Sequence, residues 1–229
     1  MTSASVENYL KAIYKLQTVQ KDTRVKTKAI ADTLDLALPS VTSMLKALSV
    51  QGLLDYIPYQ GVRLTDDGRL NALKVIRKHR LIELFLMETL GLDWSEVHAE
   101  AELLEHAMSE KLTERIDAFL GYPKLDPHGD PIPSREGVMP DALEHQNLCE
   151  ADLLVTLTLR RVLTQDRDFL TYLNDKGLTL GAHLTIIERA PFGGPITLKV
   201  DGQHRDVSLS LDTAGLLLVA SGNQEHTSS

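Results

Sequence analysis

The chain is poor in cysteine and aromatic residues, and it contains no long hydrophobic run. Its single cysteine, Cys149, excludes an intramolecular disulfide and a metal centre made of several thiolates. No apolar stretch is long enough to cross a bilayer, and the start MTSASVENYL lacks the basic and apolar regions of a signal peptide. These shortages predict a cytoplasmic protein without a membrane partner.

The charge of the chain is unevenly distributed. The 229 residues are 43% hydrophobic, enough for a sizeable core divided among two or three small domains, and the net charge is −8. Residues 1–80 contain 13 Lys and Arg against 7 Asp and Glu, whereas residues 81–229 contain 11 against 25. This basic first part indicates binding to a polyanion, although an uneven surface without a partner is the alternative.

The first 72 residues have the pattern of three short helices followed by two strands. Apolar residues stand at helical spacing in SVENYLKAIYKLQ, KAIADTL and VTSMLKAL, and the turn DLALPS joins the last two segments. Pro39 fits the first turn of the third helix, where its missing N–H costs little. The runs LLDYI and VRLT then flank PYQG. A helix-turn-helix followed by a two-stranded wing predicts a winged-helix domain.

The third of these helices exposes short polar side chains that suit a DNA groove. Short side chains with a hydroxyl group can approach base edges or phosphates, whereas lysine and arginine contact the phosphate backbone. The candidate DNA-binding residues are Lys26, Lys28, Pro39, Ser40, Thr42, Ser43, Lys46 and Arg63. The alternative is that the serines and the threonine only cap and solvate a helix.

A helical region follows, and one stretch in it, HAEAELLEH, is unusual. Two histidines and two glutamates occur there at i, i+4, i+7 and i+8, on one helix face: His98, Glu102, Glu105 and His106. The preceding helix, which ends near Gly91, carries His79 and Glu83 four residues apart. Helices joined by so short a turn pack antiparallel, so we expect His79 and Glu83 to face the second helix.

Carboxylates crowded on one helix face repel each other, and their position on that face does not make the helix more stable. A divalent cation removes this cost, and imidazole with carboxylate is a usual ligand set for first-row metals. We therefore interpret the stretch as a metal site. One alternative is a solvated acidic face. Another is a metallohydrolase or oxygenase, but ELLEH is one residue short of the H-x-x-E-H zinc-peptidase pattern, and no nucleophile or Gly-rich substrate loop accompanies it.

The last third of the chain has short alternating strands. They occur in LLVTLTLRRV, HLTIIERAPF, ITLKV, RDVSLS and LLLVA, after the proline-rich loop PKLDPHGDPIPSREGVMPDALEHQN. A small β-barrel is predicted, with one helical stretch, DRDFLTYLNDKG, that places Asp168 at a helix start. The isolated histidines receive no role: His128, His145, His183 and His204.

Three stretches, RKHRLIE, VHAEAELLEH and DPHGDPIPS, resemble the diphtheria toxin repressor family of metal-dependent transcriptional regulators, including its manganese-responsive branch. The resemblance covers nearly the whole chain. It implies a mainly α protein with a small β domain: a winged helix over 1–72, a helical dimerisation and metal-binding domain over 73–148, and an SH3-like β-barrel over 149–222. It also implies a homodimer that Fe(II) or Mn(II) makes competent to bind DNA, and no enzymatic activity.

The same resemblance implies about two metal sites per protomer. The first is matched by Asn8, Glu102, Glu105 and His106. The second is matched by His79, Glu83 and His98, completed by Gln165 and Asp168 from the C-terminal domain. Without the resemblance, Asp168 is an ordinary carboxylate in the first turn of a helix.

Three positions bear on the choice of metal. Iron-type members tend to have cysteine at the position of Glu102 and methionine at that of Asn8, so oxygen ligands at both positions favour manganese. Manganese-type members usually have a carboxylate in place of Asn8 and often another in place of Lys11, so this chain is expected to hold two separate sites. The sequence predicts a manganese-dependent dimeric repressor of metal uptake genes on a palindromic DNA operator. An iron(II)-dependent regulator and a sensor of a non-metal ligand are the alternatives.

Overall fold

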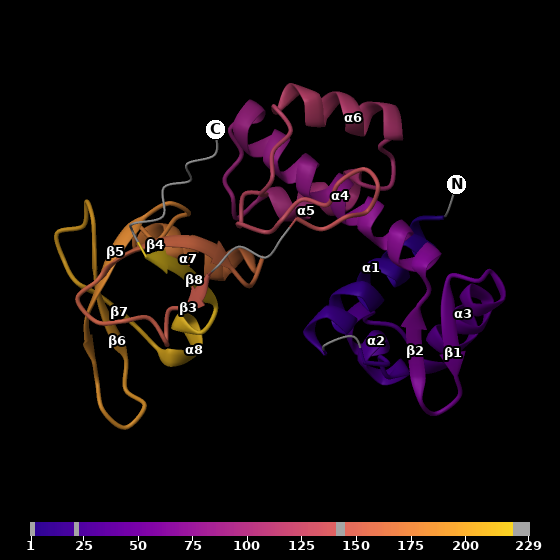
Figure 1. Cartoon of the computed structure of the whole chain (residues 1–229), viewed down its shortest axis with the longest axis horizontal. Coiled ribbons are helices and arrows are strands. Elements are labelled where there is room, and N and C mark those ends of the chain that lie inside the picture. Colours follow the sequence, from indigo (N-terminus) through magenta and orange to yellow (C-terminus); the bar gives the residue numbers. More distant parts are fainter. Residues whose placement is uncertain (1–2, 21–22, 141–144, 222–229) are drawn as a thin grey trace. The chain divides into compact units, whose positions relative to one another are not determined.

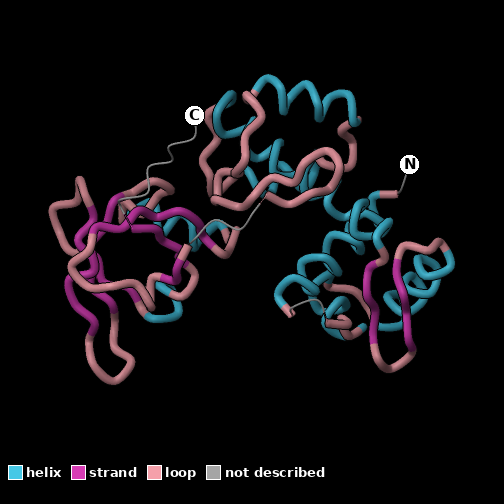
Figure 2. The backbone as a smooth tube through the Cα atoms, in the orientation of Figure 1, coloured by secondary structure: helices cyan, strands magenta, loops and turns pink. Residues whose placement is uncertain are grey.

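The computed structural model describes residues 3–20, 23–140 and 145–221 (Figure 1). It divides into two compact units. The first is formed by residues 1–82, 101–124 and 132–140, and the second by residues 83–100, 125–131 and 141–229. Among these described residues, the strands form a hairpin in the first unit and a six-stranded sheet in the second; they are drawn in magenta in Figure 2. Residue 222, the predicted end of the third domain, lies outside the described residues.

The beginning of the first unit is a winged helix, as predicted. Its elements are α1 (Ala4–Val19), α2 (Thr27–Leu34), α3 (Leu38–Val50), β1 (Leu54–Ile57) and β2 (Gly61–Leu64). Pro39 lies in the first turn of α3, where its ring is tolerated. Ile13, Ile30 and Leu45 are completely buried in one core shared by the three helices.

Gly61 allows the wing to pack tightly against the segment that precedes α2. The N–H of Val25 donates to the carbonyl of Val62 at 2.8 Å, and the N–H of Val62 donates back at 2.9 Å. Gly61 has a φ of 113°, and a Cβ at this position would lie 2.3 Å from the carbonyl oxygen of Val25. Only glycine fits there, so the wing is anchored to the helix-turn-helix.

Three further helices follow the wing: α4 (Asp66–Leu90), α5 (Val97–Leu104) and α6 (Glu110–Phe119). The hydroxyl of Thr65 accepts a hydrogen bond from the N–H of Gly68 at 3.1 Å and begins α4 where TDDG predicted a helix start. α4 continues through the predicted domain boundary after residue 72, because helical periodicity carries no mark of such a boundary. α5 ends at Leu104, so Glu105 and His106 lie in the turn after the helix rather than on it.

The second unit contains a six-stranded antiparallel sheet in the order β3-β8-β4-β5-β6-β7. The strands are β3 (Gln146–Asn147), β4 (Thr156–Val162), β5 (His183–Arg189), β6 (Ile196–Val200), β7 (Val207–Leu209) and β8 (Leu217–Ser221), with helices α7 (Arg167–Asp175) and α8 (Leu211–Ala214). Leu159, Ile186 and Leu198 are completely buried in its core. The five predicted strands and α7 are confirmed, whereas β3 and α8 are too short for a periodic signal.

Among the residues that the structure describes, no helix has both the length and the apolar character needed to cross a membrane.

Candidate metal centre

The first candidate site lies in the first unit, where α1, α4 and the end of α5 meet. His79 Nδ1 is 2.6 Å from Glu105 Oε2, and Glu105 is completely buried. Ligand atoms of His79, Glu102 and Glu105 all lie within 4.8 Å of one another, as a single metal ion requires. The sequence assigned His79 to the other site, and that assignment stays a prediction; in the structure the Nδ1 atom of His79 contacts Glu105.

Lys11 lies within this group of ligands. Its ammonium donates to Glu102 at 2.7 Å and to both carboxylate oxygens of Glu105 at 2.8 Å. α1 therefore supplies a cation, from a distant part of the sequence, that offsets part of the repulsion between these carboxylates.

His106 extends the first site toward the beginning of α1. Its Nε2 lies 2.7 Å from Asn8 Oδ1 and 3.4 Å from Glu105 Oε1. Its Nδ1 lies 2.6 Å from Glu7 Oε2. The structure thus brings Asn8, Glu105 and His106 together, as the resemblance implied. Glu7 was missed, since neighbouring helix residues point about 100° apart and only Asn8 matched the motif.

The second candidate site lies in the second unit, around Glu83. The Glu83 carboxylate is completely buried, and its Oε1 lies 3.0 Å from Nδ1 of His98. Ligand atoms of Glu83, Asp126 and His128 also lie within 4.8 Å of one another, and all three residues are buried. The sequence assigned no role to His128. Its position is decided by the fold of the loop over residues 125–131, which no local pattern reveals.

The protonation of His128 fits a metal ligand. Its Nε2 lies 2.9 Å from the carbonyl oxygen of Trp94, which fixes the proton on Nε2. Within the described part of the chain its buried Nδ1 has no hydrogen-bond partner, and it lies 3.8 Å from Glu83 Oε2. A ring-nitrogen lone pair and a carboxylate that face each other in a buried position repel each other unless a proton or a metal cation lies between them.

The loop that carries His128 is held by its own backbone and by β4. One carboxylate oxygen of Asp126 accepts from the N–H of His128 at 2.8 Å and from that of Asp130 at 2.9 Å. The carbonyl of His128 accepts from the N–H of Val162 at 2.9 Å. Gly129 has a φ of 83°, and a Cβ there would lie 2.1 Å from the carbonyl oxygen of Arg160. These contacts fix the imidazole before any ligand binds.

Gln165 and Asp168 lie near the start of α7. Asp168 is exposed in the first turn, Gln165 is half-buried, and no candidate cluster among the described His, Cys, Asp and Glu residues includes Asp168. α7 packs near the start of α5, where Asn174 donates to Asp93 at 2.9 Å. Burial acts to raise the pKa of Asp93, but hydrogen bonds from Ser95 and Asn174 outweigh it, so this pKa lies below its usual value. Gln165 and Asp168 stay predicted ligands.

Comparison with known proteins identifies the family. Residues 1–62 match the model of the iron dependent repressor N-terminal DNA binding domain, residues 65–134 that of the iron dependent repressor metal binding and dimerisation domain, and residues 146–221 that of the FeoA domain. The iron-dependent repressor IdeR of Mycobacterium tuberculosis is 34% identical over 221 residues, covering 92% of this chain and 94% of IdeR. The diphtheria toxin repressor of Corynebacterium diphtheriae is 29% identical, with the same shares covered.

The chain belongs to the diphtheria toxin repressor family. It is a metal-dependent, DNA-binding transcriptional repressor, and the prediction of a regulator rather than an enzyme is confirmed by these relatives. A solved manganese-dependent transcriptional repressor in complex with manganese is 37% identical and superimposes with a TM-score of 0.83, covering 94% of this chain and 99% of that one.

The candidate DNA-binding residues of this repressor lie at the surface of the winged helix. Seven of the eight are exposed and Thr42 is half-exposed. The hydroxyls of Thr42 and Ser43 donate to the carbonyls of Leu38 and Pro39 at 2.9 and 3.0 Å. Both hydroxyls are therefore left as hydrogen-bond acceptors, which suits amino groups on base edges.

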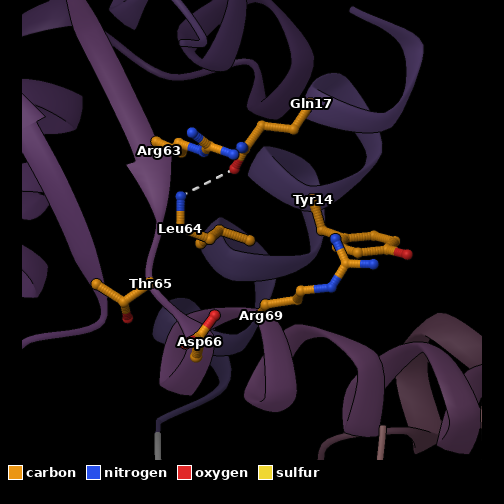
Figure 3. A pocket seen from close by; sticks show the side chains of 7 residues that line it. All are labelled: Tyr14, Gln17, Arg63, Leu64, Thr65, Asp66 and Arg69. Atoms are coloured by element: carbon orange, nitrogen blue, oxygen red, sulfur yellow. Dashed lines mark hydrogen bonds between the residues drawn. The ribbon is translucent and has the colours of Figure 1, made fainter. Parts of the chain in front are cut away.

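α1 connects the first metal site to the wing. Gln17, less than two turns after Lys11 on α1, accepts a hydrogen bond from the N–H of Leu64 at 2.9 Å, and Arg69 at the start of α4 stacks on the Tyr14 ring with 5.2 Å to its centroid (Figure 3). These residues and Arg63 line a cavity of about 470 Å³. The helix that contributes Asn8 and Lys11 to the metal site is thus fastened to the wing.

Proposed function

We propose that this repressor is manganese-dependent, and that it binds a palindromic operator as a homodimer to shut off metal uptake genes. The observation that carries the choice of metal is the donor set of the first site. It combines carboxylate and amide oxygens with imidazole nitrogens, and the only cysteine of the chain is Cys149, outside the candidate clusters. Hard oxygen ligands suit Mn(II), whereas thiolate favours softer metals.

In the first site, Glu105 is the central ligand. Its carboxylate lies between His79 on one side and His106 on the other, at 2.6 and 3.4 Å. Glu102 adds a second carboxylate and Asn8 an amide oxygen. Glu7 positions His106 by contacting the ring nitrogen opposite Asn8, in the way that carboxylates commonly orient metal-binding imidazoles.

For the second site we propose Glu83 and His98 together with Asp126 and His128. The orphaned Nδ1 of His128 and the complete burial of Glu83 support this assignment. Glu83 also lies one turn after His79 on α4, as the predicted second ligand set required. One cation at this second site and one at the first site agree with the prediction of two separate ions per protomer.

Metal control is proposed to act through α1. A bound divalent ion supplies the positive charge that neutralises the carboxylates. Asn8 and Glu7 then hold the beginning of α1 to His106, while Gln17 holds its other end to the wing. Metal binding activates the repressor only to the extent that the ion has a higher affinity for the conformation in which α1 contacts His106 and the wing than for conformations in which these contacts are broken.

Exposed apolar residues on α5 and α6 fit a homodimer interface. Leu103, Leu112 and Phe119 are 74%, 49% and 69% exposed. Exposed apolar side chains gather at protein interfaces, and a symmetric pair of protomers covers the same residues on both copies. The match of residues 65–134 to a metal binding and dimerisation domain supports the same arrangement.

A metal-dependent gel-shift experiment tests the proposal. Metal-free protein is titrated with Mn(II), Fe(II) or Zn(II) in the presence of a palindromic duplex taken from upstream of a metal-uptake gene. We expect retardation with Mn(II) at lower free metal than with the other ions. Activation by Fe(II) with none by Mn(II) supports the second candidate, an iron(II)-dependent repressor, which the names of the curated relatives favour. DNA binding that is the same with and without each of the three metals contradicts both candidate functions.

A further inference from the structure

Lys11 is a buried cation in the middle of the first metal site. The residue is 7% exposed, and its ammonium contacts both oxygens of Glu105 at 2.8 Å and one of Glu102 at 2.7 Å. The same ammonium lies 3.5 Å from His79 Nδ1. A buried ammonium is costly unless it is paired, and here two carboxylates pair it.

The contacts of Lys11 are the atoms that a divalent ion needs. Glu102 and Glu105 are two of the strongest ligands in the proposed first site, and His79 is the third member of the same cluster. An ammonium and a divalent ion repel each other at such short range, so they cannot share both carboxylates. Entry of the ion therefore requires the lysine to leave at least one of them.

We propose that Lys11 is a tethered cation that keeps the site assembled in metal-free protein and competes with the divalent ion for Glu102 and Glu105. This inference rests on the proposed function of the site. It makes Lys11 a determinant of metal affinity, which raises the free metal concentration at which the repressor responds. Because Lys11 is on α1, the displacement takes place on the same helix that Gln17 fastens to the wing.

The test compares Lys11→Met with wild type and with Lys15→Met. Methionine is unbranched and adapts to buried positions, so it removes the charge with little change in shape. Lys15 lies one turn further along α1 and is exposed, which controls for the loss of one positive charge. Manganese affinity is measured by calorimetry on full-length, chelator-treated protein, and melting is followed with and without Mn(II).

We expect Lys11→Met to melt at a lower temperature without metal and to bind Mn(II) roughly tenfold or more tightly than wild type, since the ion no longer displaces charge-assisted hydrogen bonds. Lys15→Met is expected to match wild type. Lys11→Gln, which is neutral but still able to donate hydrogen bonds, is a second variant in case Lys11→Met does not fold without metal. It too should bind Mn(II) more tightly.

The outcomes separate the two proposals. If neutral variants at Lys11 bind Mn(II) with unchanged or lower affinity while wild type binds it, the lysine is a structural partner and not a competitor. If Glu105→Ala binds Mn(II) as well as wild type does, the ion does not use this cluster, and the proposed function of the site is itself contradicted.

Discussion

At the scale of single residues, Glu102 and Glu105 share one motif but differ in burial. The Glu102 side chain is 38% exposed, whereas that of Glu105 is completely buried. The sequence predicted repulsion between these crowded carboxylates. The ammonium of Lys11 weakens this repulsion, because it lies between the two carboxylates and donates hydrogen bonds to both.

We predict that Glu105→Ala destabilises the metal-free protein by about 3–5 kcal/mol, since it removes the buried carboxylate that contacts both Lys11 and His79 and leaves Lys11 paired only with the partly exposed Glu102. Glu102→Ala is expected to cost below about 1 kcal/mol, because Glu102 is partly solvated and Lys11 keeps Glu105. Both variants should lose the part of the stabilisation by Mn(II) that comes from the first site. Urea denaturation with chelator and then with Mn(II) measures this. Equal destabilisation by the two substitutions would be inconsistent with the observed burial.

At the scale of elements, the loop over residues 125–131 decides the second site. Its contact with β4 is so close that Gly129 has no room for a Cβ, which places the His128 imidazole beside Glu83. The position of His128 therefore depends on the backbone of two elements that are distant in the sequence.

Gly129→Ala is predicted to destabilise the second unit by more than about 1 kcal/mol and to weaken binding at the second site. Gly121→Ala is a matched control, because Gly121 has a similar φ of 75° but nothing within 4 Å of an added Cβ. The Gly121→Ala variant is therefore expected to be destabilised only by the strain of an alanine at a positive φ, without any steric contact. Thermal denaturation and calorimetry on both variants give the comparison, and equal losses would show that the contact with Arg160 is unimportant.

At the scale of the whole molecule, the proposed binding to a palindromic operator requires a second copy of the chain. The exposed leucines of α5 and α6 stand in the part that matches a metal binding and dimerisation domain. Two winged helices held together bind two half-sites with the benefit of a high effective concentration.

Leu103→Glu is predicted to shift sedimentation equilibrium from dimer to monomer and to weaken binding to a palindromic duplex about a hundredfold or more, as expected when bivalent attachment is lost. Binding to a single half-site should change little. Phe192→Glu is the control, because Phe192 is fully exposed in the β5–β6 turn and lies outside the proposed interface. A Leu103→Glu protein that stayed dimeric would place the interface elsewhere.

The sequence by itself determined which segments become helices and strands, because hydrophobic period, turn residues and a proline at a helix start report local geometry. It also identified the residue types of the metal site, since His79, Glu83, His98 and Glu102 repeat at helical spacing. The motif resemblance extended this to Asn8, far away in the sequence. These inferences concern residues that share a helix face or a motif.

Only the tertiary structure decided what lies opposite those faces. The ammonium of Lys11 between two carboxylates, Glu7 on the far nitrogen of His106, and His128 beside Glu83 each join elements that are distant in the chain. Such contacts depend on how α1 packs on α5 and how one loop packs on β4, and packing involves the shape of many side chains at once. Periodicity reports the face that a side chain occupies, but it carries no information about the partner that the fold brings there.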